Sequence, residues 1–145
     1  MPSVSSASLT STTAPAPAPG EPALLAPLSP AVRRGPILQL SGHVALDADG
    51  TVHGRTVAEQ TAFVLDQITA QLSAHGGAWA DVTMVRVCLT DTAHFAEMNS
   101  VYAASVPQPF PARTTTYGPL PGDFLVEIDV MAVPAETGSP AEQPA

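Results

Sequence analysis

The sequence TVAEQTAFVLDQITAQLSAHGG, residues 56–77, contains an amphipathic helix together with its start and stop signals. Thr56 and Glu59 have the spacing of a capping box, and Gly76-Gly77 is a typical helix terminator. Between these signals, mostly apolar side chains recur on one helix face: Val57, Thr61, Val64, Leu65, Ile68 and Leu72. Because such a face is stable only when it is buried, the helix predicts a sheet that packs against it.

Residues 82–89, VTMVRVCL, predict one strand of that sheet. Both of its alternating faces are largely apolar, which is typical of a central strand. Further strands are predicted at residues 37–41, 113–117 and 125–133, and residues 42–46 either continue the first of these or form its neighbour.

A second helix is predicted after this strand. It begins near Asp91-Thr92 and ends before Pro107 and Pro109, since proline cannot continue a helix. The order of elements is then β-β-α-β-α-β-β. This order predicts an α+β fold in which one mixed sheet carries both helices on one face.

The side chains that could bind a metal ion lack the required spacing. Asp47-Ala48-Asp49-Gly50 resembles the opening of a calcium-binding loop, but the remaining ligands are missing. A hairpin turn accounts for these residues, with Gly50 free to take a positive φ. The four histidines, His43, His53, His75 and His94, show no ligand pattern. We predict a turn at residues 47–50 and no metal site.

Composition predicts one folded domain between two tails. With 145 residues, of which 45% are apolar, the chain can form a single core. Residues 1–22 and 134–145 are rich in Ser, Thr, Ala, Pro and Glu, and such segments cannot bury enough apolar surface to offset their chain entropy. We therefore predict disordered tails at residues 1–22 and 134–145, and a domain at residues 23–133.

Charge and cysteine content limit the partners and the compartment. Thirteen acidic residues against five arginines give a net charge of −8, which disfavours a nucleic-acid partner. Cys88 is the single cysteine, so no intrachain disulfide forms and a reducing compartment is expected. No secretory signal and no apolar run of about 20 residues is present. These features predict a cytoplasmic protein without a membrane partner.

Two charged residues, Arg113 and Glu127, lie in predicted strands. In the last strand we assign one face to the helix-covered core, namely Val126, Ile128, Val130 and Ala132. Glu127 then lies on the uncovered face, where we also place Arg113, Thr115 and Tyr117. Such a half-polar face with large apolar residues predicts an oligomer interface. The two charges either form a structural ion pair or bind a ligand, and the pattern alone favours neither.

At this point the sequence resembles the Rid (YjgF) family of small imine deaminases. The resemblance extends from about residue 29 to residue 133. It rests on the order and spacing of several motifs: Leu40-Ser41-Gly42, Gln60, His75-Gly76-Gly77, Phe95 to Tyr102, Pro111-Ala112-Arg113-Thr114, Leu120-Pro121 and Val126-Glu127-Ile128.

This resemblance implies a chorismate-mutase-like fold and a homotrimer with three clefts at the subunit interfaces. It implies hydrolysis of enamines and imines such as 2-aminoacrylate to a 2-oxo acid and ammonia, without a cofactor. Arg113 would bind the carboxylate of the small-molecule substrate, for which its planar fork is suited. Glu127 would activate the attacking water, as a semi-buried carboxylate can. Backbone groups near Thr115 would bind the substrate.

Other predicted contacts with the substrate are Leu28, Ser41, Gly42, His43 and Tyr117. The sequence departs from the family pattern at Leu28, where tyrosine is common, at Thr115, where cysteine is frequent, and at His43, where glutamine is frequent. The segments before Arg113 and between Arg113 and Glu127 are also shorter than in typical members. These departures concern the substrate more than the fold.

Two other functions stay open. A Rid-like catalyst could act on a different imine or carbonyl compound in a specialised, secondary-metabolite pathway. A non-catalytic trimer could bind a small acid as a sensor or carrier. A ribonuclease is disfavoured by the net charge of −8.

Overall fold

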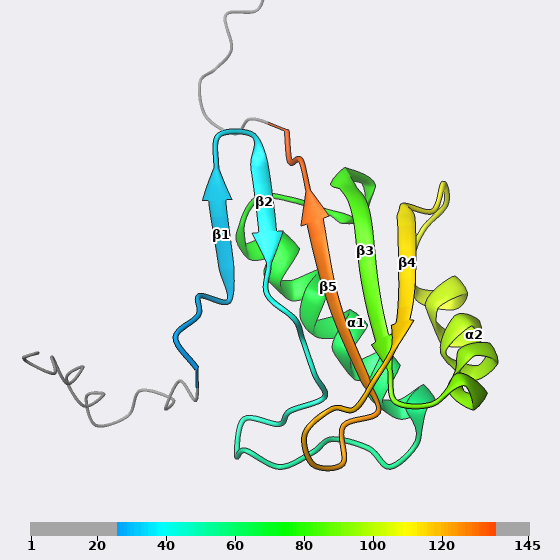
Figure 1. The fold of residues 1–145 in the computed structure, drawn as a ribbon. Helices are drawn as coiled ribbons and strands as arrows, with labels where there is room; N and C mark the ends of the chain where they lie inside the picture. Colours follow the sequence, from blue (N-terminus) through cyan, green and yellow to red (C-terminus); the bar gives the residue numbers. More distant parts are fainter. Residues whose placement is uncertain (1–25, 136–145) are drawn as a thin grey trace, which may run out of the picture.

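The computed structural model describes residues 26–135, and Figure 1 shows them as a sheet with two helices behind it. The elements in chain order are β1 (Ala31–Arg34), β2 (Ile37–Leu40), α1 (Val57–Ala74), η1 (Trp79–Asp81), β3 (Val82–Leu89), η2 (Thr92–His94), α2 (Phe95–Ser105), β4 (Ala112–Tyr117) and β5 (Val126–Ala132). The tail predicted at residues 1–22 lies outside the described residues, as does all but the start of the tail predicted at 134–145. Within the described part, neither helix is both long and apolar enough for a bilayer span.

The five strands form one mixed sheet in the order β1-β2-β5-β3-β4. β3 pairs antiparallel with β5 and parallel with β4. The chain between β3 and β4 forms α2, because a parallel neighbour requires a crossover that returns to the same end of the sheet. The predicted α+β fold, with one mixed sheet and two helices on one face, is confirmed.

Helix α1 supplies most of the layer that covers the sheet. Thr56 Oγ1 accepts a hydrogen bond from Glu59 N at 3.1 Å, and the Glu59 carboxylate accepts one from Arg55 N at 2.8 Å, which confirms the predicted cap. All six predicted face residues of α1 are buried. They pack on the apolar face of the sheet: Leu38, Leu40, Val85, Val87, Leu89, Val126, Ile128, Val130 and Ala132.

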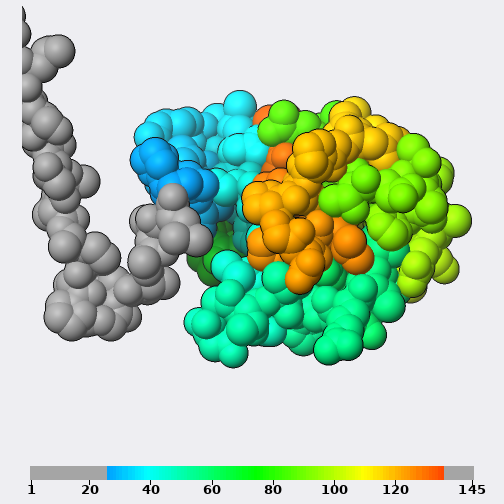
Figure 2. Space-filling view, turned by 60° about the horizontal axis from the view of Figure 1, so that its bottom comes forward, coloured from blue at the N-terminus to red at the C-terminus, as the bar shows by residue number. Residues whose placement is uncertain are grey.

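Gln60, fully buried in α1, ties two loops together at one end of the sheet. Its amide nitrogen donates to the carbonyls of Gly54 and Asp123, and its amide oxygen accepts from Leu125 N. The two loops, residues 41–56 and 118–125, lie side by side in the space-filling view of this end (Figure 2). This arrangement fixes the position at which β5 begins, one residue before Glu127.

The first hairpin differs from the prediction. The partner of β2 is β1, on its N-terminal side, and the reversal occurs at Gly35 with a φ of 55°. Residues 42–46 make only isolated bridges, His43 to Ile128 and Leu46 to Val52. The turn predicted at residues 47–50 is confirmed, since Gly50 N donates to Asp47 O at 2.9 Å.

The placement of Arg113 on the uncovered face was wrong. In the register of β3 and β4, Arg113, Thr115 and Tyr117 lie opposite Val85, Val87 and Leu89, which are core residues. Directly paired residues share a face of the sheet. Alternation identifies residues that share a face but does not identify the face. Because β4 is an edge strand beside α2, its charged residue can point toward the helices without entering the core.

Candidate functional site

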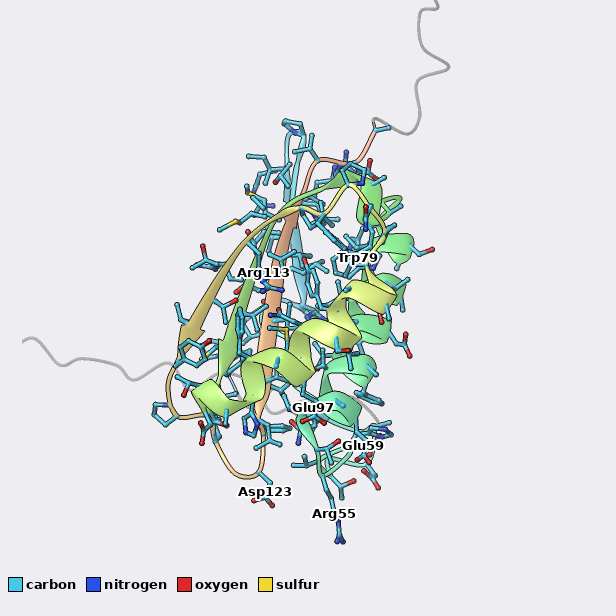
Figure 3. All side chains as sticks on the ribbon, turned by 90° about the vertical axis from the view of Figure 1, so that its right-hand side faces the viewer. Arg55, Glu59, Trp79, Glu97, Arg113 and Asp123 are labelled. Atoms are coloured by element: carbon cyan, nitrogen blue, oxygen red, sulfur yellow. The ribbon has the colours of Figure 1, made fainter. Side chains whose placement is uncertain are left out.

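Arg113 is held between the edge strand β4 and one face of α2. Its Nη2 donates to Asn99 Oδ1 at 2.6 Å, and its Cζ lies 4.8 Å from the ring centroid of Tyr102 and 5.8 Å from that of Phe95. Phe95, Asn99 and Tyr102 are spaced i, i+4 and i+7, so they lie on the same helix face. The edge-on view in Figure 3 shows Arg113 on the side of the sheet that faces the helices.

The Arg113 pocket is a cavity of about 310 Å³ at this position. Its lining consists of Asn99, Tyr102, Ala103, Phe110, Pro111 and Arg113. Arg113 is half-buried, and no carboxylate of the described residues forms a salt bridge with it. A half-buried cation without a counter-ion, in a cavity of this kind, is suited to bind an anion.

Tyr102 forms the floor beneath the guanidinium. The residue is 4% exposed, and its hydroxyl has no hydrogen-bond partner within the described residues. Burial raises the pKa of this phenol, and the positive charge of Arg113 opposes that shift to a smaller extent. Tyr102 is therefore a neutral hydrogen-bond donor at physiological pH.

Glu127 lies on the opposite face of the sheet. On β5 it pairs in register with Cys88, whereas its neighbours Val126 and Ile128 face the core. Gly42 lies directly against its carboxylate. A Cβ atom at position 42 would collide with Glu127 Oε1 and would lie 2.9 Å from Cδ.

A one-residue register shift brings Gly42 to this position. Gln39 pairs with Met131 and His43 with Ile128. Between these two pairs the chain advances by four residues on the Gln39 side but by only three on the β5 side. The extra residue is the mark of a β-bulge, and glycine is favoured where such a bulge brings two chains close together. The backbone of Gly42 therefore lies against the Glu127 carboxylate, and its predicted contact with a substrate stays a prediction.

The Glu127 pocket is a second cavity, of about 280 Å³. It is lined by Arg86, Val87, Cys88, Thr114, Thr116, Glu127 and Asp129. Arg86 Nε donates to Asp129 Oδ1 at 2.9 Å, so the nearest arginine in the register is already paired. Glu127 has no salt bridge among the described residues. The ion pair between Arg113 and Glu127 that the sequence left open does not form within the chain.

The other predicted contact residues divide between the two faces. Thr115 and Tyr117 follow Arg113 on β4, and Tyr117 is 44% exposed. Ser41 follows the core residue Leu40 and so lies on the Glu127 face, and its Oγ donates to the carbonyl of Ser29, the residue after Leu28. His43 shares the register face of Ile128, and its Nδ1 contacts Ser41 O at 2.7 Å. Within one chain, these residues do not form a single site.

The separation of the two charges follows from the sheet. Arg113 is opposite Val85 and Glu127 is opposite Cys88, three residues further along β3 and one strand to its other side. Their Cα atoms are about 14 Å apart, from ~3.3 Å per residue and ~4.8 Å per strand, and their side chains point to opposite faces. One small molecule cannot contact both charges of the same chain.

Sequence reasoning missed the aromatic support of Arg113. It did not identify Asn99 as the hydrogen-bond partner of Arg113. It did not connect Phe95 and Tyr102 with Arg113. The i, i+4, i+7 spacing of the three residues on α2 was the available signal.

Fold and site together define a small α+β protein in which, among residues 26–135, an arginine beside a helix and a glutamate on the open sheet face have no ion-pair partner. The family model described as Endoribonuclease L-PSP matches residues 19–134. The chain therefore belongs to this family, and its relatives are Rid, RutC and YjgF proteins, so the resemblance found in the sequence is confirmed.

Three relatives illustrate the similarity. The protein named 3-aminoacrylate deaminase RutC of Acinetobacter baylyi is 38% identical over 115 residues, which cover 78% of this chain and 91% of that protein. The crystal structure of RidA from Psychrobacter sp. PAMC 21119 has a TM-score of 0.72 and 32% identity, covering 77% of this chain and 92% of that one. The YjgF-family protein NMB1025 of Neisseria meningitidis has a TM-score of 0.69 and 36% identity, with 75% and 88% covered.

Proposed function

We propose that this protein is a hydrolase that converts 2-imino and 2-enamino acids of the 2-aminoacrylate type to 2-oxo acids and ammonia. The observation that carries the proposal is the half-buried Arg113, which has no counter-ion among the described residues and lines an open cavity. The 38% identity to a protein named 3-aminoacrylate deaminase supports this class of reaction.

Arg113 binds the substrate carboxylate. One guanidinium nitrogen is committed to Asn99, and the planar group keeps further N–H donors in a fixed fork. The rings of Tyr102 and Phe95 restrict its orientation. A guanidinium held in this way recognises a carboxylate bidentately and places the adjacent carbon, C2, at a defined position.

Glu127 performs the proton transfers. As water attacks C2 of the protonated imine, the carboxylate takes one proton from the water and the new C–O bond forms. The carboxylate then returns the proton to the nitrogen. As the C–N bond breaks and ammonia leaves, the carboxylate accepts the remaining hydroxyl proton, so that the 2-oxo acid forms and this proton can pass to the ammonia. An enamine substrate first takes a proton at C3 to become the imine. These steps need no metal or organic cofactor, and we propose none.

Two copies of the chain build each site. Because Arg113 and Glu127 of one chain face opposite sides of the sheet, we propose a homotrimer whose clefts combine the Arg113 pocket of one subunit with the Glu127 pocket of its neighbour. Thr115 and Tyr117 then belong to the first pocket. Leu28, Ser41 and Gly42 belong to the second, whereas His43 shares the face of Ile128 and lies at the edge of that pocket only through its backbone. A small-molecule acid is the partner, and a cytoplasmic location stays a prediction.

The reaction is tested with imines released by an amino-acid oxidase. Semicarbazide traps the free imine, and the protein is expected to reduce the yield of semicarbazone. Arg113→Ala and Glu127→Gln are each expected to weaken the effect by roughly a hundredfold or more. Unchanged semicarbazone yields across a panel of amino acids would contradict the proposed reaction.

Mixed oligomers test the shared site. Arg113→Ala and Glu127→Gln chains are unfolded together, refolded at a 1:1 ratio and assayed beside each variant alone. Random mixing into trimers pairs an intact Arg113 with an intact Glu127 at about a quarter of the interfaces, so about a quarter of wild-type activity is expected. If each chain contains a complete site, the mixture has no activity. A mass of three chains by light scattering tests the trimer.

A further inference from the structure

We propose that the Arg113 pocket selects substrates with a bulky apolar side chain, with a phenyl ring as the preferred size, over 2-aminoacrylate and other small acids. The inference rests on the proposed function for the identity of the reaction. It adds the size and chemistry of the preferred side chain, which is larger than the methylene group of 2-aminoacrylate.

The volume of the Arg113 pocket is the first observation that favours a large side chain. The Arg113 pocket is an open groove with a volume of about 310 Å³. An apolar cavity of about 150 Å³ in another protein binds benzene, and ligand pockets begin at about 300 Å³. The pocket therefore has room for a carboxylate on Arg113 and for a six-membered ring beside it. The methylene group of 2-aminoacrylate would leave most of the cavity unfilled.

The apolar and aromatic lining of the Arg113 pocket is the second observation, and it favours an apolar side chain. Apart from Arg113 and Asn99, the lining consists of Tyr102, Phe110, Pro111 and Ala103. The rings of Tyr102 and Phe110 lie 6.2 Å apart between centroids with a 46° tilt, which is within the range of interacting aromatic pairs. Phe110 is 45% exposed and Phe95 is 41% exposed, so aromatic surface extends to the mouth of the pocket. A third ring from a substrate would cover this surface.

The trigonal geometry of the reacting carbon determines which substituent can enter the Arg113 pocket. C2 of a 2-imino acid is trigonal, and its three substituents are the carboxylate, the C=N group and the side chain. When Arg113 fixes the carboxylate, only one of the other two can enter the Arg113 pocket. The described pocket offers an apolar wall and no general base, so it suits the side chain. The C=N group then points out of the pocket, where the Glu127 of a second copy must reach it.

The selectivity is measured with imines from phenylalanine and from alanine, each released at the same rate by an amino-acid oxidase and trapped with semicarbazide. The wild-type protein is expected to prefer the phenyl substrate by roughly tenfold or more in kcat/KM, which corresponds to burial of a ring. A ratio near one, or a preference for the imine from alanine, would overturn the inference while it supports the proposed reaction.

Ala103→Phe fills the pocket with a covalent phenyl group, and Ala104→Phe is the matched control. Both alanines are exposed on α2, so both variants are expected to fold. Only Ala103 lines the pocket. The ratio of phenyl to methyl activity is expected to fall at least about tenfold in Ala103→Phe and to stay at its wild-type value in Ala104→Phe. Equal ratios in the two variants would overturn the inference.

A binding experiment separates the two proposals if no imine is hydrolysed. Calorimetry with phenylpyruvate and pyruvate, the corresponding 2-oxo acids, does not require turnover. Tighter binding of phenylpyruvate that is lost in Ala103→Phe would support the selectivity while the deaminase reaction fails. Equal affinity for both acids, or binding of neither, would overturn the selectivity as well.

Discussion

The Arg113 pocket and the Glu127 pocket differ in how much of their geometry a single chain provides. Arg113 has a hydrogen bond to Asn99 and aromatic rings from the same helix on its guanidinium. Glu127 rests against Gly42, and none of the hydrogen bonds described for residues 26–135 involves its carboxylate. The group that we propose to bind the substrate is therefore held within the chain, whereas the group that we propose to transfer protons is held on one side only.

Under the proposed function, this difference indicates where a second copy would contribute. Catalytic groups are efficient when their surroundings hold them in the productive geometry. The Arg113 pocket meets this condition within one chain. The Glu127 pocket lies on the sheet face that the helices leave open, beside Cys88 and Thr116, and it gains further contacts only when that face is covered. The predictions below test this contrast, beginning with the largest expected effect.

Glu127→Gln is expected to lower kcat by roughly 10² to 10⁴, the usual contribution of one general acid–base group. The amide keeps the size of the side chain but cannot accept the proton from water. The affinity for a 2-oxo acid should change little, because the carboxylate of the ligand is bound by Arg113 of the other pocket. Stopped-flow assay of imine loss and calorimetry with phenylpyruvate separate the two quantities. A loss of affinity as large as the loss of kcat would break the division between a binding and a reacting pocket.

Arg113→Ala is expected to act mainly on KM, with a rise of roughly 10² to 10³ from the loss of a charge-assisted, bidentate contact. Arg113→Lys should recover only part of this loss, since an ammonium has no planar fork to stack on Tyr102 and Phe95. Arg34→Ala, at an exposed position on the edge strand β1, is the control. Full recovery by lysine would show that charge alone is required.

The sequence predicted the elements well because their signals are local. The cap at Thr56, the apolar period of α1 and the proline stops after α2 need no knowledge of the rest of the chain. The face of Arg113 was assigned wrongly because it depends on the register of β3 against β4, a long-range property. The strand β1 was missed because Ala31 to Arg34 has neither strong alternation nor bulky β-branched residues beyond Val32.

The contact between Gly42 and Glu127 illustrates the same limit. A resemblance to a family placed both residues near one site, but the close approach depends on the bulge between His43 and Gln39, which no local pattern indicates. In the same way, the support of Arg113 by Asn99 depends on how α2 crosses the sheet edge. The sequence could identify Arg113 and Glu127 as the charged residues of interest. Their placement on opposite faces of the sheet became clear only from the fold.

Gly42→Ala is expected to reduce kcat by about tenfold, because the new Cβ displaces the Glu127 carboxylate and leaves the Arg113 pocket unchanged. The fold should persist, since the displaced atoms are the end of a flexible side chain. Gly118→Ala is the matched control, as a Cβ there meets no atom within 4 Å. Equal kcat values for the two variants would mean that the close contact does not position Glu127.

Tyr102→Phe is expected to have the smallest effect, and it tests the Arg113 pocket through stability. The hydroxyl is buried without a partner among the described residues, so its removal at pH 7 should change the free energy of unfolding by less than about 1 kcal/mol, or increase it.

Burial raises the pKa of the Tyr102 phenol in the folded state above its ordinary value of 10.0. The unfolded chain therefore releases the proton first as the pH rises, and the folded state loses stability from about pH 10 upward. The phenylalanine variant lacks this loss, so its urea midpoint should fall less than that of the wild type between pH 9 and pH 11. Identical pH profiles of the midpoint would mean that the phenol is not desolvated beneath Arg113, and the contrast between an Arg113 held by contacts within the chain and a Glu127 without such contacts would lose part of its basis.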